Sequence, residues 1–220
     1  FVAMPDIQTV MNEALNSHTS GRLDDAERLY KQALAIDSQI SDAVHLLGVI
    51  ALARGDARKA AKTIQRAIKM RGDYPAYHGN LAVTYLNLGK FKEAAKAAHK
   101  AIKLDPVDSS FHCSLGSALD GLGKLPEAEV AFCRALEIDP ANGAALNNLG
   151  TICMRGGDFG RSVDLFTRLP GAGTGRSGGI EPESRRLYRT GQARRRREGF
   201  GSGVSYGSGF NYRAENQGET

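Results

Sequence analysis

The stretch Ala101-Ile102-Lys103-Leu104-Asp105-Pro106 decides the fold, because it returns after 34 residues as Ala135-Leu136-Glu137-Ile138-Asp139-Pro140. The pattern extends backwards to Ala67-Ile68-Lys69 and again to Ala33-Leu34-Ala35-Ile36-Asp37. A constant period of this kind is the signature of a repeat protein, in which each unit buries its apolar face against its neighbours. We place the starts of the repeat units at residues 7, 41, 75, 109 and 143, with no insertion between them.

The units share the same spacing of apolar residues along their helices and similar residues at the turns and helix ends. Leu81, Tyr85 and Leu88 lie on one stripe of a helix. A glycine turns the chain between two helices, since only Gly enters positive φ without a steric cost, and Asp-Pro ends the second helix. Small residues such as Gly116 and Ala128 let the two helices approach closely. The turn glycines are Gly21, Gly55, Gly89, Gly123 and Gly157.

This pattern resembles the tetratricopeptide repeat, and the resemblance covers residues 7–168. It implies an all-α fold, a right-handed α-α superhelix (solenoid) of antiparallel helix pairs with a 34-residue period. In the family, the first helix of each pair lines a concave groove that binds a protein or peptide. The expected organisation is a leader at 1–6, a solenoid at 7–170 with a truncated last unit, and a Gly/Arg-rich tail at 171–220.

The two ends of the solenoid depart from the family pattern. Glu13 and Ser17 stand at places that are usually apolar, which predicts a solvent-facing N-terminal end. The pattern stops at Arg168, and no capping unit follows it. We therefore expect an exposed apolar end that promotes self-association, or that a further domain would cover. Its side chains would be Phe159, Val163, Leu165, Phe166 and Leu169.

The groove-facing places of the family predict the binding residues. The sixth place of each unit reads Asn12, Leu46, Asn80, Ser114 and Asn148. Amides in a column suit an extended peptide, because each offers a donor and an acceptor to a main chain. The alternative is that they are polar helix surface. The candidate groove residues are Asn12, His45, Asn80, Asn87, Ser114, Ser117, Asp120, Asn147, Asn148 and Thr151, with Ser110 beside them.

Two comparisons with known groove types bear on the class of binding partner. The partial amide column resembles the repeat arm of O-linked N-acetylglucosaminyltransferases, and residues 42–51 resemble bacterial arms attached to glycosyltransferase or sulfotransferase domains. Members that bind chaperone tails use Lys at places held here by Met11, His45, Gly79 and Cys113. That clamp is absent, which argues against a chaperone-tail receptor.

No catalytic, metal or cofactor site is expected in the repeats. His45, His78 and His112 recur near the repeat interval, but a metal needs nitrogens about 2 Å away, and equivalent places on stacked helices lie about 8–10 Å apart. Three cysteines at Cys113, Cys133 and Cys153 are interpreted as small buried or half-buried residues. The match of 173–178 to G-x-G-x-x-G lacks a preceding strand. We predict no enzyme and no cofactor.

Charge and composition separate the body from the tail. The net charge is +5, of which +4 lies in 171–220 (nine Arg, five Glu) and +1 in 1–170. The near-neutral body gives no electrostatic reason to expect nucleic acid. The tail is a nucleic-acid-binding segment, an ordinary disordered tail, or a segment translated out of frame. The last hypothesis rests on Leu169 to Gly175, whose codons shifted by one base can encode a string close to 133–138.

Composition also bounds the cellular setting. Hydrophobic residues make up 41% of the chain, and no apolar run reaches the roughly 18 residues of a membrane span. No signal peptide is apparent, and a chain that opens on Phe1 is expected to be a fragment. Three cysteines favour a reducing compartment, so we expect a cytoplasmic protein without membrane contact.

The predicted function is a protein-interaction module, a scaffold or adaptor that binds a peptide or protein segment in the groove. The alternative is a truncated, substrate-selecting repeat arm of a glycosyltransferase-like enzyme whose catalytic domain is absent from this chain.

Overall fold

The computed structural model describes residues 6–169. The tail at 171–220 and all of the leader except Asp6 lie outside the described residues. The three interpretations of the tail therefore stay hypotheses about sequence.

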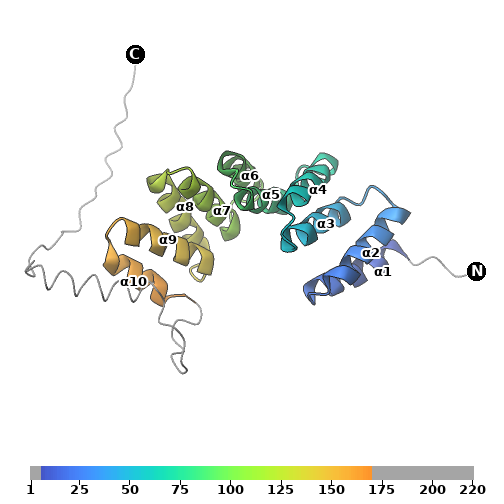
Figure 1. Ribbon diagram of the computed structural model, residues 1–220, viewed down its shortest axis with the longest axis horizontal. Helices are drawn as coiled ribbons and strands as arrows, with labels where there is room; N and C mark the ends of the chain where they lie inside the picture. The colour runs from blue at the N-terminus through green and yellow to red at the C-terminus, as the bar shows by residue number, and fades with distance from the viewer. Residues whose placement is uncertain (1–5, 170–220) are drawn as a thin grey trace, which may run out of the picture. The chain divides into compact units, whose positions relative to one another are not determined.

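The described residues form ten α-helices and no strand, arranged as a solenoid in which each unit supplies two consecutive helices. In Figure 1 the pairs follow one another in chain order from the blue end to the orange end. The first helices begin 34 residues apart, which confirms the all-α repeat fold. They are α1 (Ile7–Thr19), α3 (Ser41–Ala53), α5 (Pro75–Asn87), α7 (Ser109–Gly121) and α9 (Gly143–Arg155). The second helices are α2 (Leu23–Ile36), α4 (Ala57–Met70), α6 (Phe91–Leu104), α8 (Leu125–Ile138) and α10 (Phe159–Thr167).

The turn inside each unit is made by a glycine in the left-handed region. Gly123 has φ +75°, and past it the backbone N–H of Lys124 donates to the carbonyl oxygen of Leu119 at 2.9 Å. All five turn glycines have φ between +67° and +83°, where a side chain would be strained. The second helices α6 and α8 end directly before Asp105 and Asp139, as the Asp-Pro pairs predict.

In the second, fourth and fifth units, a glycine on the first helix faces a larger residue on the second. A Cβ added at Gly116 would lie 2.7 Å from the ring of Phe132, and one at Gly48 would lie 2.6 Å from Ile64. Phe132 and Ile64 are completely buried. The predicted close approach of the two helices is therefore confirmed, and it depends on paired sizes rather than on one residue type.

Units join because the second helix of each packs on the first helix of the next. The junction of the third and fourth units is apolar, with Phe111 of α7 lying over Gly79 of α5. A Cβ at Gly79 would come within 2.3 Å of that ring. No helix among residues 6–169 is long and apolar enough to cross a membrane.

The expectations for the two ends of the solenoid are partly wrong. Glu13 is exposed, but Ser17 is buried at 5% exposure. At the other end, Leu165 is also only 5% exposed, because it joins the core cluster that contains Phe132, and Leu169 packs against that cluster.

The short helix α10 explains how the C-terminal residues are covered. It packs on α9, and the ring of Phe166 lies so close to Gly150 that a Cβ there would be 2.8 Å away. Phe159, Val163 and Phe166 are partly buried rather than exposed. The apolar surface at this end is therefore smaller than expected, and self-association through it stays a prediction.

Candidate protein-binding face

The candidate binding face comprises the second, fifth, sixth, ninth, twelfth and thirteenth places of each unit, all on the first helices α1, α3, α5, α7 and α9. All ten predicted groove residues therefore lie on this one set of helices. Their exposure differs. Asn12, Asn87 and Asn147 are exposed, Asn80, Ser117, Asp120, Asn148 and Thr151 are partly buried, and His45 and Ser114 are buried.

Two of the predicted amides join neighbouring units. The Asn80 Nδ2 group donates to His45 Nε2 at 2.9 Å, which joins α5 to α3. The Asn148 Nδ2 group donates to the Ser117 hydroxyl at 3.2 Å, which joins α9 to α7. These side chains keep their carbonyl oxygens for a partner, but one of their donors is already used. The ability of the column to bind a main chain stays a prediction.

The His45 imidazole is a neutral part of the core. It is 6% exposed and stacks on the Tyr77 ring, with ring centroids 4.4 Å apart and planes at 24°. Burial lowers the pKa of His45 to about 4, although the charge of Asp42 acts in the opposite direction. A neutral ring that keeps its proton on Nδ1 has a free lone pair on Nε2, which accepts the Asn80 hydrogen bond.

Tyr77 extends this cluster to the edge of the face. Its hydroxyl donates to the Asp42 carboxylate and also lies 3.1 Å from the Ser41 hydroxyl. Burial, followed by the hydrogen bond to Asp42, raises the pKa of Tyr77 to about 12. The Arg71 guanidinium lies 3.5 Å from Asp42 and 4.3 Å from the centre of the exposed Tyr74 ring. The junction of the second and third units is thus polar and hydrogen-bonded.

The C-terminal part of the face is also internally paired. The Arg155 guanidinium donates to the Asp120 carboxylate, which joins α9 to α7. Thr151 donates to the carbonyl oxygen of Asn147 at 2.9 Å and Ser117 to that of Cys113 at 3.1 Å, so both hydroxyls bond along their own helices. Asp120 is therefore paired with a cation and does not present a free negative charge.

The column of ninth places, of which only Ser117 and Thr151 are predicted groove residues, divides this face into two halves. The ninth places carry apolar side chains in three units and hydroxyls in two. Leu15 is 48% exposed and Val83 is 36% exposed, so both offer apolar surface to a partner at the same place of their units. The aliphatic members of the column can be found from the sequence by comparing the ninth place in all five units. The column is Leu15, Val49, Val83, Ser117 and Thr151.

The remaining histidines and the cysteines have structural roles. His78 Nε2 donates to the carbonyl oxygen of Gly72 at 2.9 Å, and His112 Nε2 donates to that of Pro106 at 3.0 Å, so each holds the loop before its helix. Cys113 and Cys153 are buried and Cys133 is half-buried, as predicted, and burial raises the pKa of all three thiols. Residues 6–169 contain no cluster of His, Cys, Asp and Glu that could hold a metal ion.

One open cavity lies away from the candidate face. It has a volume of about 300 Å³ and is lined by residues of α2, α3 and α4, among them Glu27, Ile50, Lys59 and Arg66. Its lining mixes charges of both signs with aliphatic side chains, and it gathers no set of groups suited to catalysis.

Solved structures share this fold at low sequence identity. TTC0263, a thermophilic TPR protein of Thermus thermophilus, is 17% identical with a TM-score of 0.67, covering 86% of this chain and 100% of its own. MamA from Desulfovibrio magneticus RS-1, from residue 41 to its end, is 20% identical with a TM-score of 0.65, covering 86% and 98%. YrrB, described as a TPR protein with an unusual peptide-binding site, is 21% identical with a TM-score of 0.59, covering 74% and 84%.

The sequence itself matches a family. No curated protein matches the chain. The tetratricopeptide-repeat profile, however, matches it in four overlapping segments, at 19–78, 45–109, 80–143 and 113–177. These segments together run from residue 19 to residue 177 and cover well over half of the sequence. The chain belongs to the tetratricopeptide-repeat family.

Proposed function

We propose that this protein is a scaffold or adaptor that binds a segment of another protein along the face formed by α1, α3, α5, α7 and α9. The observation that carries the proposal is the division of the ninth column into exposed aliphatic and hydroxyl halves. It predicts a ligand whose apolar residues lie on the first three units and whose polar residues lie on the last two.

The apolar half offers contact without charge. Leu15 and Val83 are exposed, and Val49 lies partly buried between them in the column. Covering such groups is favourable by about 25 cal/mol for each Å² of apolar surface removed from water. A ligand with aliphatic or aromatic side chains at one end would gain this contribution.

The polar half offers hydrogen-bonding groups that do not depend on the charge of the ligand. Asn147 is exposed, and the carbonyl oxygen of Asn148 is available while its Nδ2 group bonds Ser117. Amides of this kind pair with main-chain groups whatever the ligand side chains are. The peptide-binding site named for YrrB supports the same class of ligand, since that protein shares the fold.

The test is a selection from a random peptide library displayed on phage, with the full chain as bait. Selected peptides should carry an apolar cluster at one end. They should bind the Val83→Asp variant at least about tenfold more weakly, because a carboxylate placed among aliphatic groups must be desolvated on binding.

The matched control is Val130→Asp, which makes the same change on α8 at a side chain that is 70% exposed and outside the face. Equal losses for the two variants, or a library that yields no peptide, would overturn the proposal.

A second candidate function is the substrate-selecting arm of a glycosyltransferase-like enzyme. The amides of Asn12, Asn80 and Asn148 in the sixth column favour it, since they resemble the amide column of such arms. A reading frame that continues the repeats into a glycosyltransferase domain would support this candidate, and a frame without one would exclude it.

A further inference from the structure

The near-zero net charge of the repeats conceals a strongly basic middle. Residues 6–53 carry three basic and seven acidic side chains, and residues 105–169 carry five basic and nine acidic ones, so each part has a net charge of −4. Residues 54–104 carry twelve basic and three acidic ones, a net charge of +9. The whole-body charge therefore could not reveal this segment.

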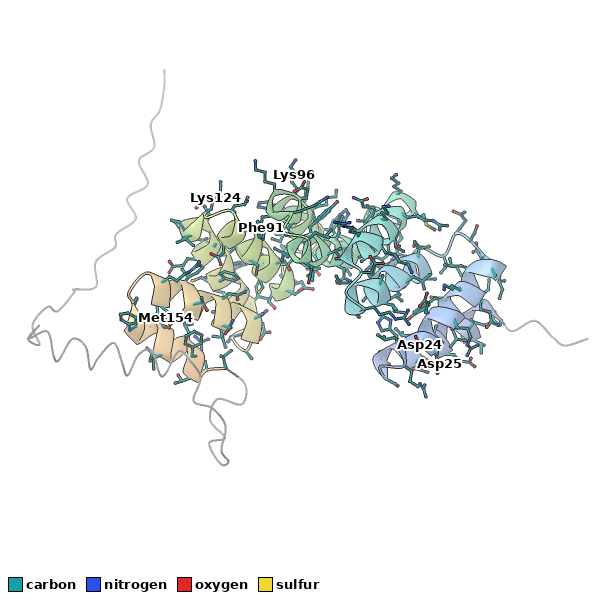
Figure 2. The ribbon with its side chains drawn as sticks, viewed as in Figure 1. Asp24, Asp25, Phe91, Lys96, Lys124 and Met154 are labelled. Atoms are coloured by element: carbon teal, nitrogen blue, oxygen red, sulfur yellow. The ribbon has the colours of Figure 1, made fainter. Side chains whose placement is uncertain are left out.

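The excess charge lies on the second helices of two successive units. We call it the basic face, and it contains one acidic neighbour, Glu93. Every member is exposed, and Figure 2 shows Lys96 projecting away from the ribbon of α6. The members are Arg58, Lys59, Lys62, Arg66 and Lys69 on α4, and Lys92, Lys96, Lys100 and Lys103 on α6.

The basic face repeats with the period of the fold. Lys62 and Lys96 occupy the same place in their units, and three other pairs on α4 and α6 do likewise. Four cations on each helix are spaced four, four and three residues apart, which is about 6 Å per step and about 17 Å in all. The result is two matching stripes of positive charge, both on helices that pack on α5.

These charges have no partners within the repeats. None of the nine side chains forms an ion pair with another residue in the range 6–169. On the neighbouring second helices the opposite holds, since Lys31 pairs with Glu27 on α2 and Arg134 pairs with Glu137 on α8. Like charges four residues apart destabilise a helix by about 0.2–0.5 kcal/mol per pair, so the stripes act against stability.

We propose that the basic face binds a short acidic segment of a partner protein. On a helical segment, carboxylates four residues apart recur about every 6 Å, which matches the step of each stripe. Seven of the nine cations are lysines, whose flexible stems adjust to separate carboxylates rather than form one planar fork.

The surroundings of the face favour a short partner over an extended polyanion. The flanking segments 6–53 and 105–169 each carry −4, and they adjoin the basic segment 54–104 through α3 against α4 and through α6 against α7. Exposed charges interact over about 8–10 Å at physiological salt, so the two negative segments act on whatever lies beside them. A duplex nucleic acid or an anionic bilayer extends far beyond the two stripes, so it would also approach these negative segments. A segment about as long as one stripe avoids them.

A second copy of this chain is a poorer match. Most of its acidic side chains on second helices are already engaged, for example Glu27 with Lys31 and Arg54, and Glu129 with Arg161. Binding to the basic face would require these pairs to be exchanged for others of similar strength.

The experiment uses a blocked, alanine-based helical peptide of about 16 residues with Glu at every fourth position, and a copy with Gln in those positions. Fluorescence anisotropy with the full chain should show at least about tenfold tighter binding of the Glu peptide. The difference should shrink as salt is raised, because exposed charges are screened.

A fourfold variant identifies the surface responsible. Neutralising two cations on each stripe should reduce Glu-peptide binding about tenfold or more, whereas the same number of changes on α2, on α8 and at the residue directly before α8 should not. The tail is common to both variants, so its arginines cannot produce the difference. The stripe variant is Lys62→Gln, Arg66→Gln, Lys96→Gln and Lys100→Gln, and the control is Arg28→Gln, Lys31→Gln, Lys124→Gln and Arg134→Gln.

The outcomes separate this proposal from the others. Equal binding by the two variants would overturn it. Tighter binding of a short DNA duplex or of phosphatidylserine vesicles through the same lysines would replace the acidic segment by nucleic acid or membrane. The phage-selected peptides should bind the stripe variant normally, so failure at one face is distinguishable from failure at the other.

Discussion

The third and fourth repeat units (75–108 and 109–142) share a backbone but differ in their interior and on their surface. The third unit buries Ala82 and Ala98 at the two facing places where the fourth buries Gly116 and Phe132. On the surface, the third unit presents a row of cations at places where the fourth presents a mixed set that includes the exposed Val130. The fold therefore depends on complementary sizes inside each pair of helices, and it leaves the outer surface free to acquire binding functions.

The largest expected effect on the free energy of unfolding comes from removing the ring of Phe132, which the third unit lacks. Phe132→Ala should lower the free energy of unfolding by about 3–5 kcal/mol, because the fully buried ring leaves a cavity beside Gly116. Val130→Ala, two residues away on the exposed side, should change it by less than about 0.5 kcal/mol. Urea denaturation followed by circular dichroism measures both. Similar effects of the two changes would mean that the aromatic core of the fourth unit does not stabilise it.

The junctions on either side of the third unit should differ in their response to pH. His45 has a pKa near 4 in the folded protein and about 6.5 in the unfolded chain. The unfolded chain therefore binds the proton more readily, and this contribution to stability is complete above about pH 6.5 and falls as the pH drops towards 4, by up to about 3 kcal/mol. The apolar contact of Phe111 with Gly79 has no titrating group.

His45→Gln should flatten this dependence, measured as the urea midpoint between pH 7.5 and 4.5, while His99→Gln on the exposed side of α6 should leave it unchanged. A parallel decline in the wild type and in His45→Gln would show that the acid sensitivity lies elsewhere.

The complementary sizes of Gly116 and Phe132 in the fourth unit can be tested by changing one residue and then both. Gly116→Ala should destabilise by about 1–3 kcal/mol, because its Cβ would lie 2.7 Å from the Phe132 ring. In the Phe132→Ala background the same change recreates the alanine pair of the third unit and should stabilise by up to about 1 kcal/mol, the helix preference of Ala over Gly. A double-mutant cycle in urea measures the coupling. An effect of Gly116→Ala that is equal in both backgrounds would show that the sizes of residues 116 and 132 are not coupled.

Sequence reasoning found the period, the turn glycines and the small residues because each depends on local geometry that repeats in every unit. It predicted a candidate face but not the hydrogen bonds between the residues on it. The pairing of Asn80 with His45 joins residues 35 apart and depends on how the units stack. Polarity and a place near an end of the solenoid predict exposure for Ser17 and Leu165, but packing against the adjacent helix buries both side chains. The basic face was overlooked because a total charge averages over segments of opposite sign.

The smallest expected effect on the free energy of unfolding comes from the stripe of lysines on the third unit. Lys96 lies four residues from both Lys92 and Lys100, so Lys96→Gln should raise the free energy of unfolding by roughly 0.5 kcal/mol at low salt. Added salt should remove the gain, because it screens the repulsion in the wild type. Val130→Gln makes the same new residue at the equivalent place of the fourth unit, where no row of like charges exists, and its effect should not depend on salt. A gain for Lys96→Gln that persists in concentrated salt would reflect helix preference rather than repulsion. A gain that salt removes would establish that the stripe is maintained at a cost to stability, which is the behaviour expected of a surface kept for a partner.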